Sequence, residues 1–260
     1  MIKGRNQKKV ALVLSGGGAK GFAHYGLIKE LENYAVSIEY IVGTSMGAII
    51  GATYALYNSL EPLEPFIDFE TKDLFSLKDI SFKGKGLLKG KKIEKLLEAV
   101  FKDAEFKDTK IPLLITAVDI QTGDETVFSS GSIIKAIRAS ISIPFVFEPF
   151  EDNGAFYMDG GISNNMPYAY VPKTFRKVIL SNSNAYLPKI NKKDSGIKFL
   201  FHFITLMENT TTKMPKGKKF IPIMPHLENI YLWDFEKIDE AIQKGKEEAQ
   251  RVLPKYFKRK

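Results

Sequence analysis

Short continuous apolar runs and stretches of helical spacing alternate along the first part of this chain. The apolar run at 10–14 ends at glycines, which is typical of a strand covered on both faces. Residues 20–34 place apolar side chains at helical spacing, and a second strand at 39–42 precedes a helix at 48–57. Because strands and helices alternate, the pattern predicts a parallel sheet with helical connections.

The alternation breaks at 59–91, where prolines, glycines, aromatic residues and lysines are mixed, and we interpret this segment as an insertion or lid. Periodic segments then return. In chain order they predict a helix at 92–101, strands at 113–118 and 126–128, a helix at 132–139, strands at 155–158 and 177–180, and closing helices at 197–211 and 237–251.

Length and composition fit one α/β domain. The chain has 260 residues, of which 44% are hydrophobic, enough to bury a single core. It contains no cysteine, which excludes disulfides and thiolate chemistry. Its histidines, His24, His202 and His226, are not spaced as metal ligands. We therefore expect neither a metal nor a cofactor.

The lengths of the apolar runs indicate where in the cell the protein is found. The run at 10–14 follows basic residues, as in a signal peptide, but it is too short for one. No stretch approaches the roughly 18 apolar residues of a membrane span. We expect a cytoplasmic protein that is at most peripheral to a membrane.

Basic residues are in excess, with a net charge of +8. Within the insertion, Phe82, Leu87 and Leu88 are interleaved with lysines, a pattern that favours contact with anionic lipid headgroups but is equally typical of a solvated face. Residues 255–260 have the composition of a loose basic tail. No nucleic-acid-binding module is recognisable, so nucleic acid is not an expected partner.

The sequence Gly43-Thr44-Ser45-Met46-Gly47 stands between the second predicted strand and the helix that follows it. In this context a Gly-x-Ser-x-Gly segment forms a sharp strand-to-helix turn, and the two glycines remove side chains that would collide there. The serine hydroxyl then projects near the positive end of the helix dipole. Ser45 is therefore the candidate nucleophile.

A glycine-rich loop, Gly16-Gly17-Gly18-Ala19-Lys20-Gly21, follows the first strand. Its backbone N–H groups can surround an anion, either a phosphate or the oxyanion of an acyl-transfer transition state. Gly16, Gly18 and Gly21 also match the spacing of a dinucleotide-binding loop. That fingerprint requires an acidic residue at the end of the second strand, where this chain has the serine turn instead.

A third segment, Asp159-Gly160-Gly161, follows the predicted strand at 155–158. An aspartate at the carboxyl end of a strand lies on the rim where open α/β sheets place their ligands. Taken alone, Asp-Gly is more often an ordinary Asx-turn. Its occurrence with the other two rim motifs favours a functional role for Asp159.

Together these three motifs resemble those of the patatin-like phospholipase family, over roughly residues 8–185. The resemblance implies a three-layer α/β/α fold with a mainly parallel central sheet. The length of the chain fits a single domain spanning 1–260, and helical periodicity after the part that resembles the family predicts a helical closing region at 195–260. The resemblance also implies a catalytic dyad of Ser45 as nucleophile and Asp159 as base, without a histidine. The remaining implied site residues are the oxyanion-hole glycines Gly16, Gly17 and Gly18 and the supporting residues Lys20, Gly21, Gly43, Gly47, Gly160 and Gly161.

The resemblance implies a lipid acyl hydrolase of the phospholipase A or lysophospholipase type, which forms an acyl-Ser45 intermediate that water hydrolyses. Three alternatives stay open. A Ser-Asp-His esterase would use His226, which follows Asp159 in the chain order of α/β-hydrolases. A nucleotide-binding protein would use the glycine loop for phosphates, and a non-catalytic lipid-binding protein would keep the fold alone. We interpret His202 as packed in a helix and His24 as support for the glycine loop.

Overall fold

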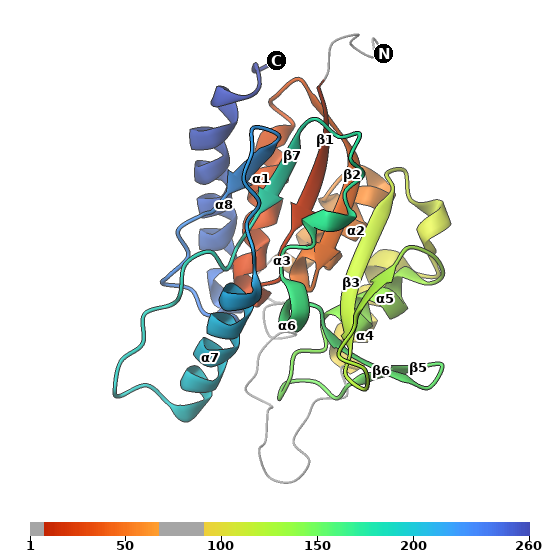
Figure 1. The fold of residues 1–260 in the computed structure, drawn as a ribbon, viewed down its shortest axis with the longest axis vertical. Coiled ribbons are helices and arrows are strands. Elements are labelled where there is room, and N and C mark those ends of the chain that lie inside the picture. Colours follow the sequence, from red (N-terminus) through yellow and green to blue (C-terminus); the bar gives the residue numbers. More distant parts are fainter. Residues whose placement is uncertain (1–7, 68–90) are drawn as a thin grey trace.

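The computed structural model describes residues 8–67 and 91–260, and a mixed, mainly parallel sheet forms its centre (Figure 1). The order of its strands is β5-β6-β3-β2-β1-β7-β8, with β4 paired to β3. Strands β1, β2, β3, β7 and β8 run parallel, whereas β4 and β6 are antiparallel to β3 and β5 is antiparallel to β6. The strands are β1 (Lys8–Leu14), β2 (Val36–Thr44), β3 (Leu113–Asp119), β4 (Glu125–Phe128), β5 (Phe150–Asp152), β6 (Ala155–Asp159), β7 (Val178–Ser181) and β8 (Phe220–Ile223).

Helices cover both faces of this sheet, one thickly and the other thinly. On the thick side pack α1 (Ala23–Leu31), α2 (Met46–Tyr57), α4 (Lys91–Phe101), α5 (Ile133–Ser140) and α8 (Ile238–Val252). The other face carries a short helix, α6 (Gly161–Asn164), and the segment after it, while α7 (Gly196–Thr211) lies beyond the end of the sheet (Figure 1). A further short helix, α3 (Glu64–Ile67), precedes residue 68. The predicted α/β class with helical layers is confirmed.

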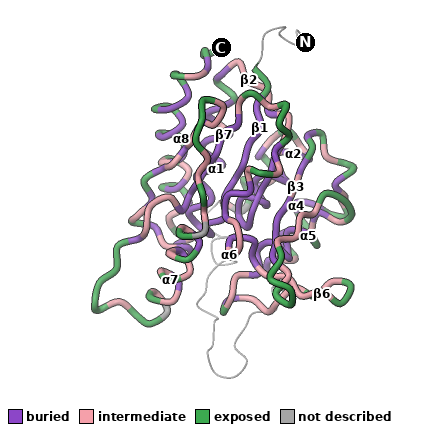
Figure 2. The backbone as a smooth tube through the Cα atoms, viewed as in Figure 1, coloured by how far each residue is buried: buried purple, intermediate pink, exposed green. Residues whose placement is uncertain are grey.

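The two faces of the sheet have separate cores, because successive side chains of a strand point to opposite sides. In β1, Val10, Leu12 and Leu14 belong to the core under the helices, whereas Ala11 and Val13 belong to the core of the thin side. Both sets are fully buried. Figure 2 shows the central strands buried along most of their length. This two-sided burial explains the continuous apolar run at 10–14.

Four short α-helices and strands of the described residues escaped the sequence analysis: α3, β5, α6 and β8. Strand β8 contains Pro222, which cannot donate a ladder hydrogen bond, so its sequence is a poor strand signal. As the last strand in the sheet order it tolerates this loss at its free edge. The predicted insertion at 59–91 lies largely outside the described residues.

The C-terminal residues are not the loose basic tail that their composition suggested. The Lys258 carbonyl accepts a hydrogen bond from the Ala35 N–H at 3.1 Å, and the Lys260 N–H donates to the Asn33 carbonyl at 2.9 Å. The Arg259 guanidinium lies 2.8 Å from the carboxylate of Glu30 in α1. The end of the chain is therefore fixed against the turn between α1 and β2.

Candidate active site

Ser45 occupies a strained turn between β2 and α2. Its backbone angles are φ 52° and ψ −123°, a conformation that non-glycine residues rarely adopt. A Cβ on Gly43 would lie 2.5 Å from the Gly47 carbonyl oxygen, and one on Gly47 would lie 2.4 Å from that of Leu14. The Ser45 N–H donates to the Ser140 hydroxyl at 2.7 Å, which fixes the turn from α5. Both motif glycines are thus required by close backbone contact.

Asp159 stands at the end of strand β6, which brings it next to Ser45. Strand β6 runs antiparallel to β3, whereas β1 and β2 run parallel to it. On β3, Thr116 is the register partner of Thr44, and the next residue, Ala117, is the partner of Asp159. The ends of β2 and β6 therefore meet at adjacent positions of β3. The sequence analysis placed Asp159 on the correct rim, although it did not recognise that its strand is antiparallel.

Ser45 and Asp159 form a buried pair. The Ser45 hydroxyl donates to Asp159 Oδ2 at 2.5 Å, and the Gly161 N–H donates to Asp159 Oδ1 at 2.8 Å. Their relative exposures are 3% and 4%. Burial raises the pKa of Asp159 to about 6, although the hydrogen bonds from Ser45 and Gly161 act in the opposite direction. The carboxylate is thus a stronger base than an exposed aspartate.

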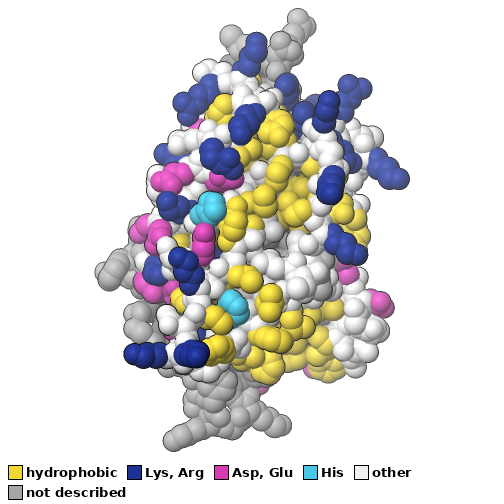
Figure 3. Space-filling view, turned by 60° about the vertical axis from the view of Figure 1, so that its left-hand side comes forward, with side chains coloured by type: hydrophobic (Ala, Val, Ile, Leu, Met, Phe, Trp, Pro, Cys, Tyr) yellow, Lys and Arg dark blue, Asp and Glu magenta, His cyan; other side chains and the backbone are white. Residues whose placement is uncertain are grey.

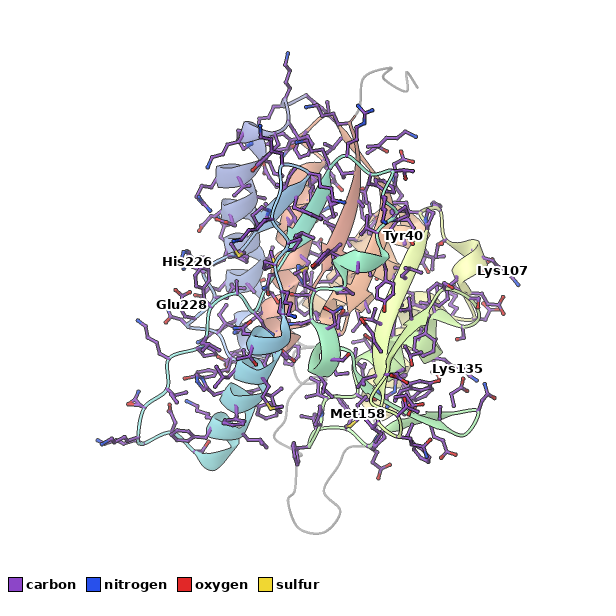
Figure 4. The ribbon with its side chains drawn as sticks, in the orientation of Figure 1. Tyr40, Lys107, Lys135, Met158, His226 and Glu228 are labelled. Carbon is purple, nitrogen blue, oxygen red and sulfur yellow. The ribbon has the colours of Figure 1, made fainter. Side chains whose placement is uncertain are left out.

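None of the histidines is hydrogen-bonded to Ser45 or Asp159 in the described part of the chain. His226 is exposed, stacks on Tyr186 and lies with its Nδ1 2.9 Å from Glu228 Oε1. Figure 4 shows His226 and Glu228 together on the side of the molecule where α8 lies. His24 is fully buried, with Nε2 2.8 Å from the Ser15 carbonyl and Nδ1 2.8 Å from the Ser181 hydroxyl.

The glycine loop lies directly against the nucleophile. A Cβ on Gly16 would come within 2.9 Å of Ser45 Cβ, and one on Gly21 within 2.5 Å of Met46 Cβ. The Gly16 N–H donates to Asn165 Oδ1 at 2.7 Å. Within the described residues, no hydrogen bond engages the N–H groups of Gly17 and Gly18, whose φ angles are 149° and 52°. Two of the three predicted oxyanion donors are therefore unengaged beside Ser45.

Serine hydroxyls hold the peptide that joins Gly16 to Gly17. The Gly16 carbonyl accepts from Ser183 Oγ at 2.6 Å and from Ser15 Oγ at 2.9 Å. Because a trans peptide is planar, its C=O and the following N–H point in opposite directions. Fixing the Gly16 carbonyl therefore also fixes the direction of the Gly17 N–H.

A buried polar network continues from the loop to α7. Glu208 Oε2 accepts from Asn184 Nδ2 at 2.8 Å and from Asn165 Nδ2 at 3.4 Å. Burial raises the pKa of Glu208 to about 8, with a further contribution from the nearby Asp159 charge. Lys20 is fully buried and its Nζ has no hydrogen-bond partner within the described residues. Burial lowers the pKa of Lys20 to about 8, against the attraction of Glu208 and two other carboxylates.

The sequence analysis missed the supporting residues Ser140, Asn165, Ser183 and Glu208. Asn165 follows the Asp-Gly-Gly segment by a few positions and was the only one adjacent to a motif. Glu208 sits in a helix whose sequence resembles an ordinary packed helix, and Ser140 and Ser183 are single serines. No local pattern distinguishes them, because each acts through a contact distant in the sequence.

Residues 12–171 match the model of the patatin-like phospholipase family. The chain belongs to this family. An uncharacterized NTE family protein of Mycobacterium bovis is 33% identical over 168 residues, which cover 65% of this chain and 47% of that protein. Patatin-like phospholipase domain-containing protein 6 of Mus musculus is 32% identical over 164 residues, covering 61% of this chain and 12% of that protein.

The fold is also found in a solved structure. VipD from Legionella pneumophila superposes with a TM-score of 0.58 at 15% identity, covering 97% of this chain and 67% of that chain. The chain spans about half the length of the mycobacterial relatives that it matches, with 47% and 46% of two of them covered.

Among the described residues, none of the helices combines the length and the apolar composition that a membrane span requires. The described residues also contain no group of three or more His, Asp or Glu side chains that could hold a metal ion.

Proposed function

We propose that this chain is a lipid acyl hydrolase that cleaves carboxylic ester bonds of phospholipids or related acyl lipids, with Ser45 as nucleophile and Asp159 as base. The observation that carries the proposal is the hydrogen bond from the Ser45 hydroxyl to Asp159 Oδ2, made at a strained turn beside a glycine loop. Membership of the patatin-like phospholipase family supports the choice of lipid esters.

In the proposed first step, the Ser45 proton passes to Asp159 while Oγ attacks the ester carbonyl carbon. The N–H groups of Gly17 and Gly18 donate to the oxygen that becomes negative, and such donors contribute roughly 3–4 kcal/mol each. The intermediate then collapses. The alcohol or lysolipid leaves with the proton from Asp159, and the acyl group stays on Ser45.

In the second step, Asp159 accepts a proton from the water that attacks the acyl-Ser45 carbonyl. The bond from the carbonyl carbon to Ser45 Oγ then breaks, Asp159 returns the proton to Oγ, and the fatty acid leaves. Gly16 contributes differently from its two neighbours, because its N–H already donates to Asn165. We assign it the role of keeping side-chain atoms away from Ser45 and holding the loop in place.

The test is labelling with a fluorophosphonate, followed by mass spectrometric identification of the modified peptide. We expect an adduct on Ser45 in the wild-type protein, none in Ser45→Ala, and strongly reduced labelling in Asp159→Asn with the fold intact by circular dichroism. Release of fatty acid from phosphatidylcholine vesicles should follow the same order.

The matched control is His226→Ala, which removes an exposed side chain paired with Glu228. We expect its turnover to equal that of the wild type. A loss of several hundredfold in this variant would favour the Ser-Asp-His alternative. Vesicle binding that is unchanged by Ser45→Ala, with no labelling and no turnover in any protein, would identify a non-catalytic lipid-binding protein instead.

A further inference from the structure

Helix α7 has two faces of opposite role. Its inner face buries Phe201, Thr205 and Glu208, at 2%, 1% and 8% exposure, and Glu208 joins the polar network at the candidate active site. Its outer face presents Phe199 and Phe203, with Met207 following at the same spacing; their exposures are 42%, 60% and 52%. The outer face of a surface helix is normally polar. We call these three exposed side chains the α7 face.

A third exposed aromatic residue, Phe145, lies on a segment that packs against this helix. Val146 is buried together with Phe201 of α7, and Ile143 packs against the same cluster. Between them, Phe145 is 54% exposed and has a φ of 67°, which is strained for a bulky residue. This segment follows Ser142, whose carbonyl accepts the Asp159 N–H at 3.0 Å. Phe145 is thus three residues from a residue that is hydrogen-bonded to Asp159.

The sequence that contains and flanks α7 is mainly positive. Over residues 189–216 there are two acidic residues, Asp194 and Glu208. Asp194 lies 3.3 Å from Lys198, and Glu208 points inward. The other lysines of this stretch are exposed: Lys189, Lys192, Lys193, Lys213 and Lys216. Figure 3 shows hydrophobic side chains gathered over the lower part of the molecule, with Lys and Arg side chains beside them.

We propose that the α7 face and Phe145 form the surface by which this protein docks onto an anionic lipid layer. The apolar side chains would enter the acyl boundary while the flanking lysines pair with anionic headgroups, as in interfacial helices. The inference rests on the proposed lipid substrate and adds the route by which it arrives. Because the buried side of α7 contributes to the active site, docking would bring the ester bonds of the layer close to Ser45.

Charge favours a lipid layer over a second copy of the chain as the occupant of this surface. In a twofold symmetric dimer, the same patch faces itself. The lysines that flank α7 would then oppose one another, whereas an anionic lipid surface attracts each of them. Complementarity of charge and apolar character together therefore indicate lipid.

The experiment measures flotation with vesicles of phosphatidylcholine and phosphatidylglycerol, using Ser45→Ala protein throughout so that the lipid is not consumed. We expect the Ser45→Ala protein to bind these vesicles. Adding both Phe199→Gln and Phe203→Gln to it should weaken vesicle binding roughly tenfold or more. The control Ile120→Gln changes a side chain of similar exposure, 46%, at the turn after β3 and should leave binding unchanged. Lys192→Gln with Lys193→Gln should weaken binding to these vesicles but not to phosphatidylcholine alone.

A second assay separates this inference from the proposed function: hydrolysis of a water-soluble short-chain ester, measured with Ser45 intact. Because this ester needs no docking, the protein with Phe199→Gln and Phe203→Gln should hydrolyse it as fast as the wild type. Equal vesicle binding by the pair and its parent would overturn the docking surface, even if ester turnover is normal. The docking surface would also be overturned if sedimentation velocity showed that the parent protein is a dimer and that the variant with both phenylalanine substitutions is a monomer. Absence of ester turnover in the wild type would instead refute the proposed function.

Discussion

At the residue scale, the environment of Asp159 accounts for how a carboxylate could serve as the base of a serine nucleophile. The side chain is buried beside Ser45, and burial raises its pKa to about 6. A carboxylate with a raised pKa holds a proton more strongly, which makes the transfer from a serine hydroxyl less unfavourable. At neutral pH the group nevertheless remains mostly ionised and ready to accept that proton.

The first prediction concerns pH. Because Asp159 must be unprotonated to act, kcat/KM for a soluble ester should fall as pH decreases, with a midpoint near the Asp159 pKa of about 6. The measurement is a pH–rate profile over a range in which circular dichroism shows the protein folded. A profile that is flat through pH 6 would contradict the role of this carboxylate.

The raised pKa of Asp159 also means that its ionised form lowers the stability of the folded protein. The folded protein binds this proton more tightly than the unfolded chain, so the cost of burying the ionised group is present above pH 6 and disappears as pH falls toward 4. At pH 8, Asp159→Asn should be more stable than the wild type by on the order of 2 kcal/mol. Urea unfolding of both proteins at pH 8 and pH 4 checks this, since the difference should shrink at the lower pH.

A third prediction concerns Glu208, a positioning residue for the glycine loop. Its Oε2 accepts from Asn165, whose Oδ1 in turn accepts the Gly16 N–H. Glu208→Ala should lower kcat by roughly tenfold or more with little change in KM, because oxyanion contacts strengthen in the transition state. Glu208→Gln keeps an accepting oxygen and should restore most of this loss at neutral pH. Equal loss of kcat in the alanine and glutamine variants would exclude positioning through this hydrogen bond.

At the element scale, the crossing of α1 and α8 depends on two glycines that no motif identified. A Cβ on Gly26 of α1 would lie 2.0 Å from the Ile242 carbonyl oxygen, and one on Gly245 of α8 would lie 2.0 Å from that of Ala23. Each helix thus approaches the backbone of the other. The sequence analysis predicted both helices but not their contact, because periodicity describes a helix face and not its partner.

This crossing gives a fourth prediction. Gly245→Ala should destabilise the protein by about 2–4 kcal/mol, because the two backbones must separate to admit a methyl group. The control is Gly196→Ala at the start of α7, where an added Cβ would meet no atom within 4 Å. In that variant alanine should be neutral or slightly stabilising, through its higher helix propensity. Thermal unfolding of both variants measures the contrast, and similar melting temperatures would refute the close crossing.

At the scale of the whole molecule, the C-terminal residues are held against α1 and the turn that precedes β2. Arg259 pairs with Glu30, whose side chain is 1% exposed, and backbone hydrogen bonds fix the neighbouring residues against the start of β2. The Glu30 carboxylate also accepts from Gln250 of α8 and from Asn33. Burial of Glu30 opposes ionisation, but these hydrogen bonds outweigh it and keep its pKa below the usual value.

The fifth prediction follows from this pair. Arg259→Ala leaves the buried Glu30 carboxylate without its cation and should cost about 1–3 kcal/mol at neutral pH. Because the pKa of Glu30 is lowered by folding, its stabilisation is present above the unfolded pKa and is lost as pH falls through the folded one. The cost measured by urea unfolding should therefore decrease in acid. Lys255→Ala, which removes an exposed lysine nearby, is the control and should have little effect at either pH.

The local parts of the candidate site could be predicted from the amino-acid sequence. The glycines around Ser45 and in the loop at 16–21 are required by backbone angles and close contacts within a few residues, so their pattern is visible along the chain. The longer helices and most of the strands were predictable for the same reason, since their periodicity is local.

How these parts come together could not be predicted from the sequence, because it depends on pairing between distant segments. Ser45 and Asp159 are separated by 114 positions, and they come together because the antiparallel strand β6 pairs with β3 immediately beyond the end of β2. Contacts between segments that are distant in the sequence also decide the hydrogen bond from Gly16 to Asn165 and the burial of the Glu208 carboxylate. The same holds for the pairing of His226 with Glu228 instead of with Ser45 or Asp159. Strand order, register and helix contacts are set by packing between distant segments, which no local pattern of residues specifies.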